Sequence, residues 1–240
     1  MEKIFYIFLF FIFLFENSAM AQREIFVIKK INKEITIDGN ITPEEWGTKP
    51  TITRFYRADN IEKPVNSKTS VWILYDHQYL YVAAHIEDKD IIANCTKKDS
   101  FGLFSDDVFE LFIKPNFKSK YFYEIDVNPV GTVFDACLQF RHLYLHNAIE
   151  FSSGVVCAIK IYGTLNNMKD TDAGWDIELK IPFSSFDGIC PPKKGDTWYF
   201  AVCRTEYSVF LPNGKEYSSS ARLRKLDFHS YDDYDIMLFK

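Results

Sequence analysis

Several features that mark large functional classes are missing from this 240-residue sequence. Lys and Arg are not in excess, and a formal net charge of −5 excludes the basic face that nucleic-acid binding requires. The HExxH, GxSxG, P-loop and GxGxxG motifs are absent, as is any CxxC or His/Cys spacing typical of a metal site. The sequence therefore offers no recognisable catalytic motif, and we expect a protein that is not an enzyme.

Cysteine is scarce and odd in number, with five residues. An odd count leaves at least one thiol over if pairing is intramolecular. Cys137, Cys157 and Cys203 lie in apolar runs typical of strands, where a small buried hydrophobe is the better interpretation. We therefore expect no disulfide framework.

Long hydrophobic runs are missing except at the N-terminus. Residues 4–15 are uninterruptedly apolar after a short charged start, and an A-x-A triplet ends at residue 21. This run is shorter than the roughly 20 residues that span a membrane. We therefore expect residues 1–21 to be a signal peptide cleaved before Gln22, and the mature protein to be secreted or periplasmic with no membrane span.

Long helical patterns are also missing, since no stretch shows an extended 3.6-residue apolar period. Short apolar and aromatic runs alternate instead with turns rich in Gly, Pro, Asn and Asp. Strands are predicted over residues 71–75, 79–86, 109–113, 121–128, 132–138, 155–162, 175–181, 198–207 and 236–239, and short helical turns at 43–46 and 182–186. Residues 22–240 are thus predicted to form a single all-β domain, an antiparallel β-sandwich or jelly-roll-like fold.

Six sequence blocks stand out along the chain. They are IDGNI at 37–41 with a Trp at 46, the VWILYD/YLYV pair at 71–82, DDVFELFI at 106–113, YFYEIDVN at 121–128, GTVFD at 131–135 and GWDIELKIPF at 174–183. In content and order they resemble the family 9 carbohydrate-binding modules and their relatives in the DOMON superfamily. The resemblance implies a β-sandwich that binds carbohydrate of the glucan or xylan type, or another glycan.

The resemblance also implies an altered binding site. In the best understood members of that family, two Trp side chains clamp the sugar, while charged and amide side chains bond its hydroxyls. Here Phe104 stands near the first clamp position, and Phe228 and His229 stand near the second. Glu124 falls where a sugar-bonding Arg would align.

Alternation along the strands predicts a polar surface. Glu124, Asp126 and Asn128 share one face of their strand. Arg204 and Glu206 share one face of another strand, predicted over residues 198–207. If these strands are neighbours, they form a polar floor flanked by aromatic rings, the build of a sugar site; a solvated sheet face is the alternative. The candidate ligand-binding residues are Phe104, Asp106, Glu110, Glu124, Asp126, Asn128, Arg204, Glu206, Phe228 and His229.

Other functions stay open beside this one. Two positioned carboxyl groups could serve a glycoside hydrolase, although their spacing does not favour it. A DOMON-type domain that binds haem or another cofactor, or a structural protein-interaction domain, would use the same fold. No cofactor is required, but structural calcium is an option, with Asn166, Asp170 and Asp172 as candidate ligands; ordinary turn chemistry explains the same residues. We expect an exported, non-catalytic carbohydrate-binding protein.

Overall fold

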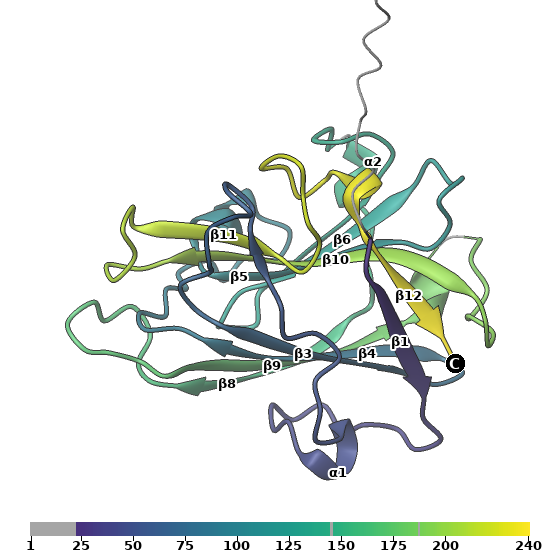
Figure 1. Ribbon diagram of the computed structural model, residues 1–240, viewed down its shortest axis with the longest axis horizontal. Coiled ribbons are helices and arrows are strands. Elements are labelled where there is room, and N and C mark those ends of the chain that lie inside the picture. The colour runs from purple at the N-terminus through teal and green to yellow at the C-terminus, as the bar shows by residue number, and fades with distance from the viewer. Residues whose placement is uncertain (1–22, 145, 187) are drawn as a thin grey trace, which may run out of the picture.

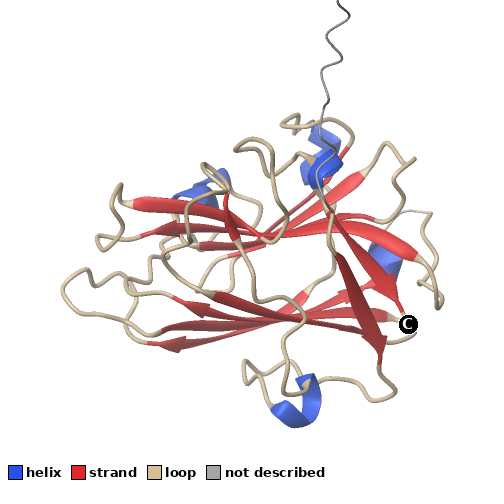
Figure 2. Ribbon diagram, in the orientation of Figure 1, coloured by secondary structure: helices blue, strands red, loops and turns tan. Residues whose placement is uncertain are grey.

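The computed structural model describes residues 23–144, 146–186 and 188–240. The expected signal peptide and its cleavage site before Gln22 lie outside these residues. Strands form two stacked layers, which confirms the all-β sandwich (Figures 1 and 2). Helical elements in the described part of the chain are short: α1 (Pro43–Trp46), α2 (His146–Ile149) and the 3-10 turns η1 (Phe101–Ser105), η2 (Phe183–Ser185) and η3 (Tyr231–Asp233). None of the described helices is long and apolar enough to cross a membrane.

The two layers are joined by the first strand. Sheet A, the upper layer in Figure 1, contains β2 (Tyr56–Arg57), β5 (Val108–Lys114), β6 (Phe122–Val127), β7 (Val133–Leu138), β10 (Thr197–Tyr207), β11 (Lys215–Ser219) and β12 (Asp235–Phe239). Sheet B contains β3 (Thr69–Tyr75), β4 (Tyr79–Glu87), β8 (Val156–Tyr162) and β9 (Gly174–Pro182). β1 (Ile25–Lys30) pairs in parallel with β12 and then with β3. The expected antiparallel pairing holds for the other strand pairs, and β1 departs from it because it crosses between the sheets.

Sheet A is buried on both faces. Its inner face packs against sheet B through alternating apolar residues such as Phe109 and Leu111 of β5. Its outer face carries a second apolar cluster, to which Phe112 and Cys203 belong, and segments 95–104 and 221–234, together with Tyr144 and Ile149, contribute to that cluster. Cys203 is fully buried, as its apolar setting predicts, whereas Cys137 and Cys157 are only partly buried. Any site on this face is therefore shaped by those covering segments.

The first sequence block is anchored to sheet B by one carboxylate. Glu178 of β9 accepts the backbone N–H groups of Asp38 and Gly39 at 2.9 and 2.7 Å, and the indole N–H of Trp46 at 2.7 Å. Gly39 has φ +85°, and a Cβ there would lie 3.2 Å from the Ile159 carbonyl. The block thus requires glycine at this position and an acceptor opposite it.

The junction of β12 with the N-terminal strand gives a pH-dependent prediction. Asp235 is buried; one carboxyl oxygen accepts the Glu24 N–H at 2.8 Å, and the other has no hydrogen-bond partner among the described residues. Burial raises the pKa of Asp235 from 3.8 to about 7, so its ionisation costs stability as the pH rises between these values. We expect Asp235→Asn to gain stability over the wild type by up to about 3 kcal/mol between pH 4.5 and pH 8.5. Urea unfolding at both pH values measures this gain, and an equal difference at both would contradict the assignment.

Candidate functional site

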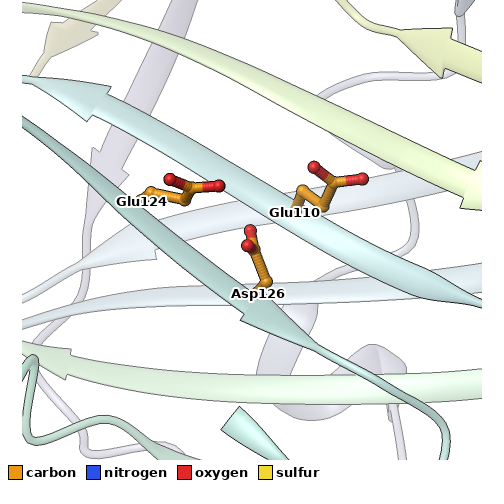
Figure 3. A group of neighbouring side chains, drawn as sticks. All are labelled: Glu110, Glu124 and Asp126. Atoms are coloured by element: carbon orange, nitrogen blue, oxygen red, sulfur yellow. The ribbon is translucent and has the colours of Figure 1, made fainter. Parts of the chain in front are cut away.

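Three carboxylates gather on the outer face of sheet A, and we call Glu110, Glu124 and Asp126 the carboxylate cluster (Figure 3). Glu110 of β5 is in register with Asp126 of β6, and Glu124 precedes Asp126 by two residues. Side chains in these positions share a face of the sheet. One oxygen from each lies within 4.8 Å of the others, and all three residues are buried. These three residues therefore share one face of the sheet, as the sequence predicted, but they are buried and do not form an open surface.

The members of the cluster differ in their partners. Glu110 accepts a hydrogen bond from the Thr205 hydroxyl at 2.7 Å, whereas no N–H or hydroxyl group in the described part of the chain donates to either carboxyl oxygen of Asp126. Burial raises the pKa of Glu110 to about 8. Burial, with the neighbouring charges of Glu124 and Glu110, raises the pKa of Asp126 well above its usual range. The cluster is thus a place where negative charge is strongly disfavoured unless something compensates it.

Tyr144 and His229 close the cluster from outside. Nδ1 of His229 accepts the backbone N–H of His142 at 2.9 Å, which assigns the ring proton to Nε2. That Nε2 lies 3.1 Å from the Tyr144 hydroxyl, which donates to Glu124 at 2.7 Å. A chain of donors from His229 through Tyr144 therefore fixes the Glu124 carboxylate.

Aromatic rings extend from the cluster to the surface. Phe101, Phe104, Phe134 and Tyr144, which we call the aromatic group, lie in mutual contact, with Phe101 5.5 Å from Phe134 and 5.4 Å from Tyr144 between ring centroids. Phe134 of β7 is in register with Asp126. Phe101 is 54% exposed and forms the outer end of the group. Phe104, predicted near a sugar clamp, therefore belongs to a larger aromatic surface.

Asp106 and Asn128, also predicted at the site, organise the chain beside it. Asn128 donates to the Cys95 carbonyl and to Asp106, each at 2.8 Å. Asp106 accepts the backbone N–H groups of Asn94 and Cys95 at 2.9 and 2.8 Å. These bonds hold the segment that leads to η1, so the two residues position the aromatic group.

Arg204 and Glu206 do not join the polar floor. Arg204 is in register with Phe109, whose side chain lies in the core between the sheets, so Arg204 points away from the carboxylate cluster. Its guanidinium lies 3.1 Å from Asp88 and 3.2 Å from Glu206, and all three residues are buried. Alternation within one strand cannot reveal this, because the register of β10 against β5 decides which face is shared.

The residues that cover the outer face were only partly predictable. Phe228, expected at the site, is half-buried against Phe112, with ring centroids 6.2 Å apart, and does not belong to the aromatic group. Tyr144 lies in a segment without strand or helix periodicity and gives no sequence signal. Phe101 has a weak signal, the FGLF run that it opens.

The loop predicted as a calcium site uses its oxygens to hold two chain segments together. Asn166 bonds both backbone groups of Ala93, accepting its N–H and donating to its carbonyl, each at 2.9 Å. Asp172 accepts the N–H of Ile91 at 2.9 Å, and Asp170 accepts the hydroxyl of Thr164 at 2.6 Å. Calcium binding there stays a prediction.

A surface pocket of about 460 Å³ adjoins the segment that carries Phe101. Its polar lining comes from Thr96, Lys98, Thr132, Asp135 and Ser152. Lys98 lies 3.7 Å from Asp135, and residues 96–98 lead into η1. A larger pocket of about 760 Å³ lies between β1 and residues 43–51, but no exposed aromatic ring lines it. The smaller pocket thus offers charged and hydroxyl groups close in sequence to an exposed ring, a combination suited to a small polar ligand.

A β-sandwich that joins carboxylates and aromatic rings on one sheet face has the build of a ligand-binding module. The family model described as carbohydrate family 9 binding domain-like matches residues 37–205. The chain belongs to this family.

Solved structures share the fold at low sequence identity. A Bacteroides uniformis protein named for carbohydrate binding has a TM-score of 0.65 and 16% identity, covering 91% of this chain and 100% of its own. A family 9 carbohydrate-binding module from Caldicellulosiruptor kristjanssonii in complex with cellotriose has a TM-score of 0.62 and 14% identity, covering 90% and 94%. A structure of such a module from the same organism with glucose has a TM-score of 0.59 and 13% identity, covering 90% and 96%. No curated protein matches the chain.

Proposed function

We propose that the protein is exported and binds carbohydrate non-covalently on the outer side of sheet A. The observation that carries this proposal is the Phe101 ring, which is 54% exposed at the end of the aromatic group. Apolar faces of sugar rings stack on such aromatic surfaces. Family membership supports the same ligand class, and related folds bind cellotriose and glucose. A glucan-type oligosaccharide is therefore our first candidate.

The sugar would meet a surface different from an open polar floor. Tyr144 and His229 cover the carboxylate cluster: Tyr144 donates to Glu124, and His229 is hydrogen-bonded to Tyr144. We therefore place the sugar on Phe101, with its hydroxyls directed to Lys98, whose side chain is 52% exposed and lines the neighbouring pocket. This arrangement uses one stacking ring and one charged side chain in place of a clamp of two Trp side chains.

Binding without catalysis fits the carboxylates on this face. A glycosidase pair flanks the scissile bond about 5 Å or more apart and must reach it. Glu110, Glu124 and Asp126 are instead buried, so a glycosidic bond would not reach them. The apolar N-terminal run supports export, and the six sequence blocks support a wider kinship with the DOMON superfamily.

Substitution of the exposed ring tests the proposed site. Phe101→Ala should weaken binding of cellotriose about tenfold or more in isothermal titration calorimetry, because the sugar loses its stacking surface. Phe117→Ala is the matched control, since Phe117 is 41% exposed but packs against Tyr199, away from the aromatic group. Equal affinities for the two variants would contradict the placement of the site.

A further inference from the structure

We propose that the carboxylate cluster is a binding site for a divalent cation of the calcium type, with Glu110, Glu124 and Asp126 each supplying an oxygen. Nothing in the carbohydrate-binding role requires this ion. The proposal starts from Asp126, which is 0% exposed and receives no hydrogen bond from any N–H or hydroxyl group of the described residues. A buried carboxylate left in this state is costly, and such groups are normally paired or bound to a metal.

The charges on this face point to a missing cation. In the described chain, no Lys or Arg is ion-paired with any member of the cluster, and the nearest basic group is His229, 3.5 Å from Glu124. Arg204 lies on the other side of the sheet with Asp88 and Glu206. Three neighbouring carboxylates therefore have no compensating charge among the side chains that face them.

The geometry suits a single ion. One oxygen from each carboxylate lies within 4.8 Å of the other two. Calcium–oxygen bonds are about 2.3–2.6 Å long, so opposite ligands of one ion are separated by up to about 5 Å. Magnesium keeps several waters in its coordination shell, so a buried set of carboxylates suits it less than it suits calcium. An all-carboxylate set also favours a hard cation over zinc or copper.

The surroundings provide the outer support that metal ligands have. Tyr144 donates to Glu124 and is itself bonded by His229, so this carboxylate is held in one orientation. Thr205 does the same for Glu110 at 2.7 Å. Hydrogen bonds of this kind orient metal ligands. Asp126, the member without such a bond, is left free to point at the ion.

Thermal unfolding with calcium alone as the probe tests the site. Purified protein is stripped with a chelator and titrated with Ca²⁺, with Mg²⁺ and Zn²⁺ in parallel. Binding should raise Tm by roughly 5–10 °C at a hundredfold excess over Kd, most strongly for Ca²⁺. Asp126→Asn and, as a second variant in case the first does not fold, Glu110→Gln should lose this rise. The quantity compared between the wild type and each variant is the rise in Tm on addition of calcium, because removing a buried charge also changes the Tm of the calcium-free protein.

Asp170→Asn is the matched control, because it alters the other candidate calcium loop and leaves the cluster intact. It should keep the full calcium-induced rise. A rise that persists in Asp126→Asn and Glu110→Gln, or that disappears only in Asp170→Asn, would overturn the proposal. So would the absence of any rise in the wild type, which would mean that protons neutralise the cluster. None of these outcomes depends on sugar binding, which is measured separately with cellotriose.

Discussion

Replacing Arg204 by Ala is expected to destabilise the protein by roughly 3–5 kcal/mol, the usual cost of removing one partner from a buried ion pair. The Arg204 side chain is 2% exposed and lies 3.1 Å from Asp88 and 3.2 Å from Glu206. Without it, these carboxylates remain buried with no cation beside them. Burial already raises the pKa of Glu206 to about 7 even with Arg204 present. The loss should appear as a lower midpoint of urea unfolding.

Arg54→Ala is the control for this prediction. Arg54 also forms an ion pair, with Glu24 at 3.3 Å, but its side chain is 70% exposed. Exposed pairs contribute little because water screens them, so this variant should unfold like the wild type. Similar midpoints for Arg204→Ala and Arg54→Ala would contradict the role of Arg204 as the buried counter-charge.

Glu178→Gln should cost about 2–4 kcal/mol, because it removes an acceptor that serves three donors. Glu178 is 0% exposed and accepts the N–H groups of Asp38, Gly39 and the Trp46 ring. A Gln side chain replaces one acceptor oxygen by an NH₂ group, which would face a donor. Glu34→Gln provides the comparison, since Glu34 is 62% exposed and pairs with Lys180. If both variants had the wild-type unfolding midpoint, Glu178 would not be the anchor of this segment.

The strands with strong apolar alternation were predictable from the sequence. The hairpin predicted at 71–75 and 79–86 is β3 and β4, and the helical turn predicted at 43–46 is α1. Three strands were missed: β1, β2 and β11. β11 reads KEYSS, and its polar residues are buried by pairing with β10 rather than by an apolar face. β1 has no clear apolar face, since Ile25 is 62% exposed. Its place between the sheets is set by pairing with β12 and β3, which are distant in sequence.

The part of the candidate site that lies on one strand, or on one pair of neighbouring strands, was predictable from the sequence. Glu124 and Asp126 lie on one strand and Glu110 on the next, and they do share a face. The predicted position of Arg204 was wrong because the sequence does not determine the register between β10 and β5. A shift of one residue in that register would move the side chain to the other face of the sheet. Tyr144 could not be predicted, because a loop residue reaches the cluster only through tertiary packing.

The proposed cation site and the proposed sugar-binding surface lie on the same face of sheet A. The buried carboxylates lie beneath Tyr144, and the same residue belongs to the aromatic group that ends at Phe101. An ion in the cluster would hold Glu124, and through it Tyr144, in one position. Calcium should therefore rigidify the ring surface on which we place the sugar.

The central claim is that this protein binds carbohydrate, and a glycan array tests it most directly. The purified protein is applied with and without calcium, beside the Phe101→Ala variant. We predict selective binding to a small set of glycans that is lost in the variant. Absence of binding to every glycan in both conditions would contradict the claim and would leave the β-sandwich with a different ligand.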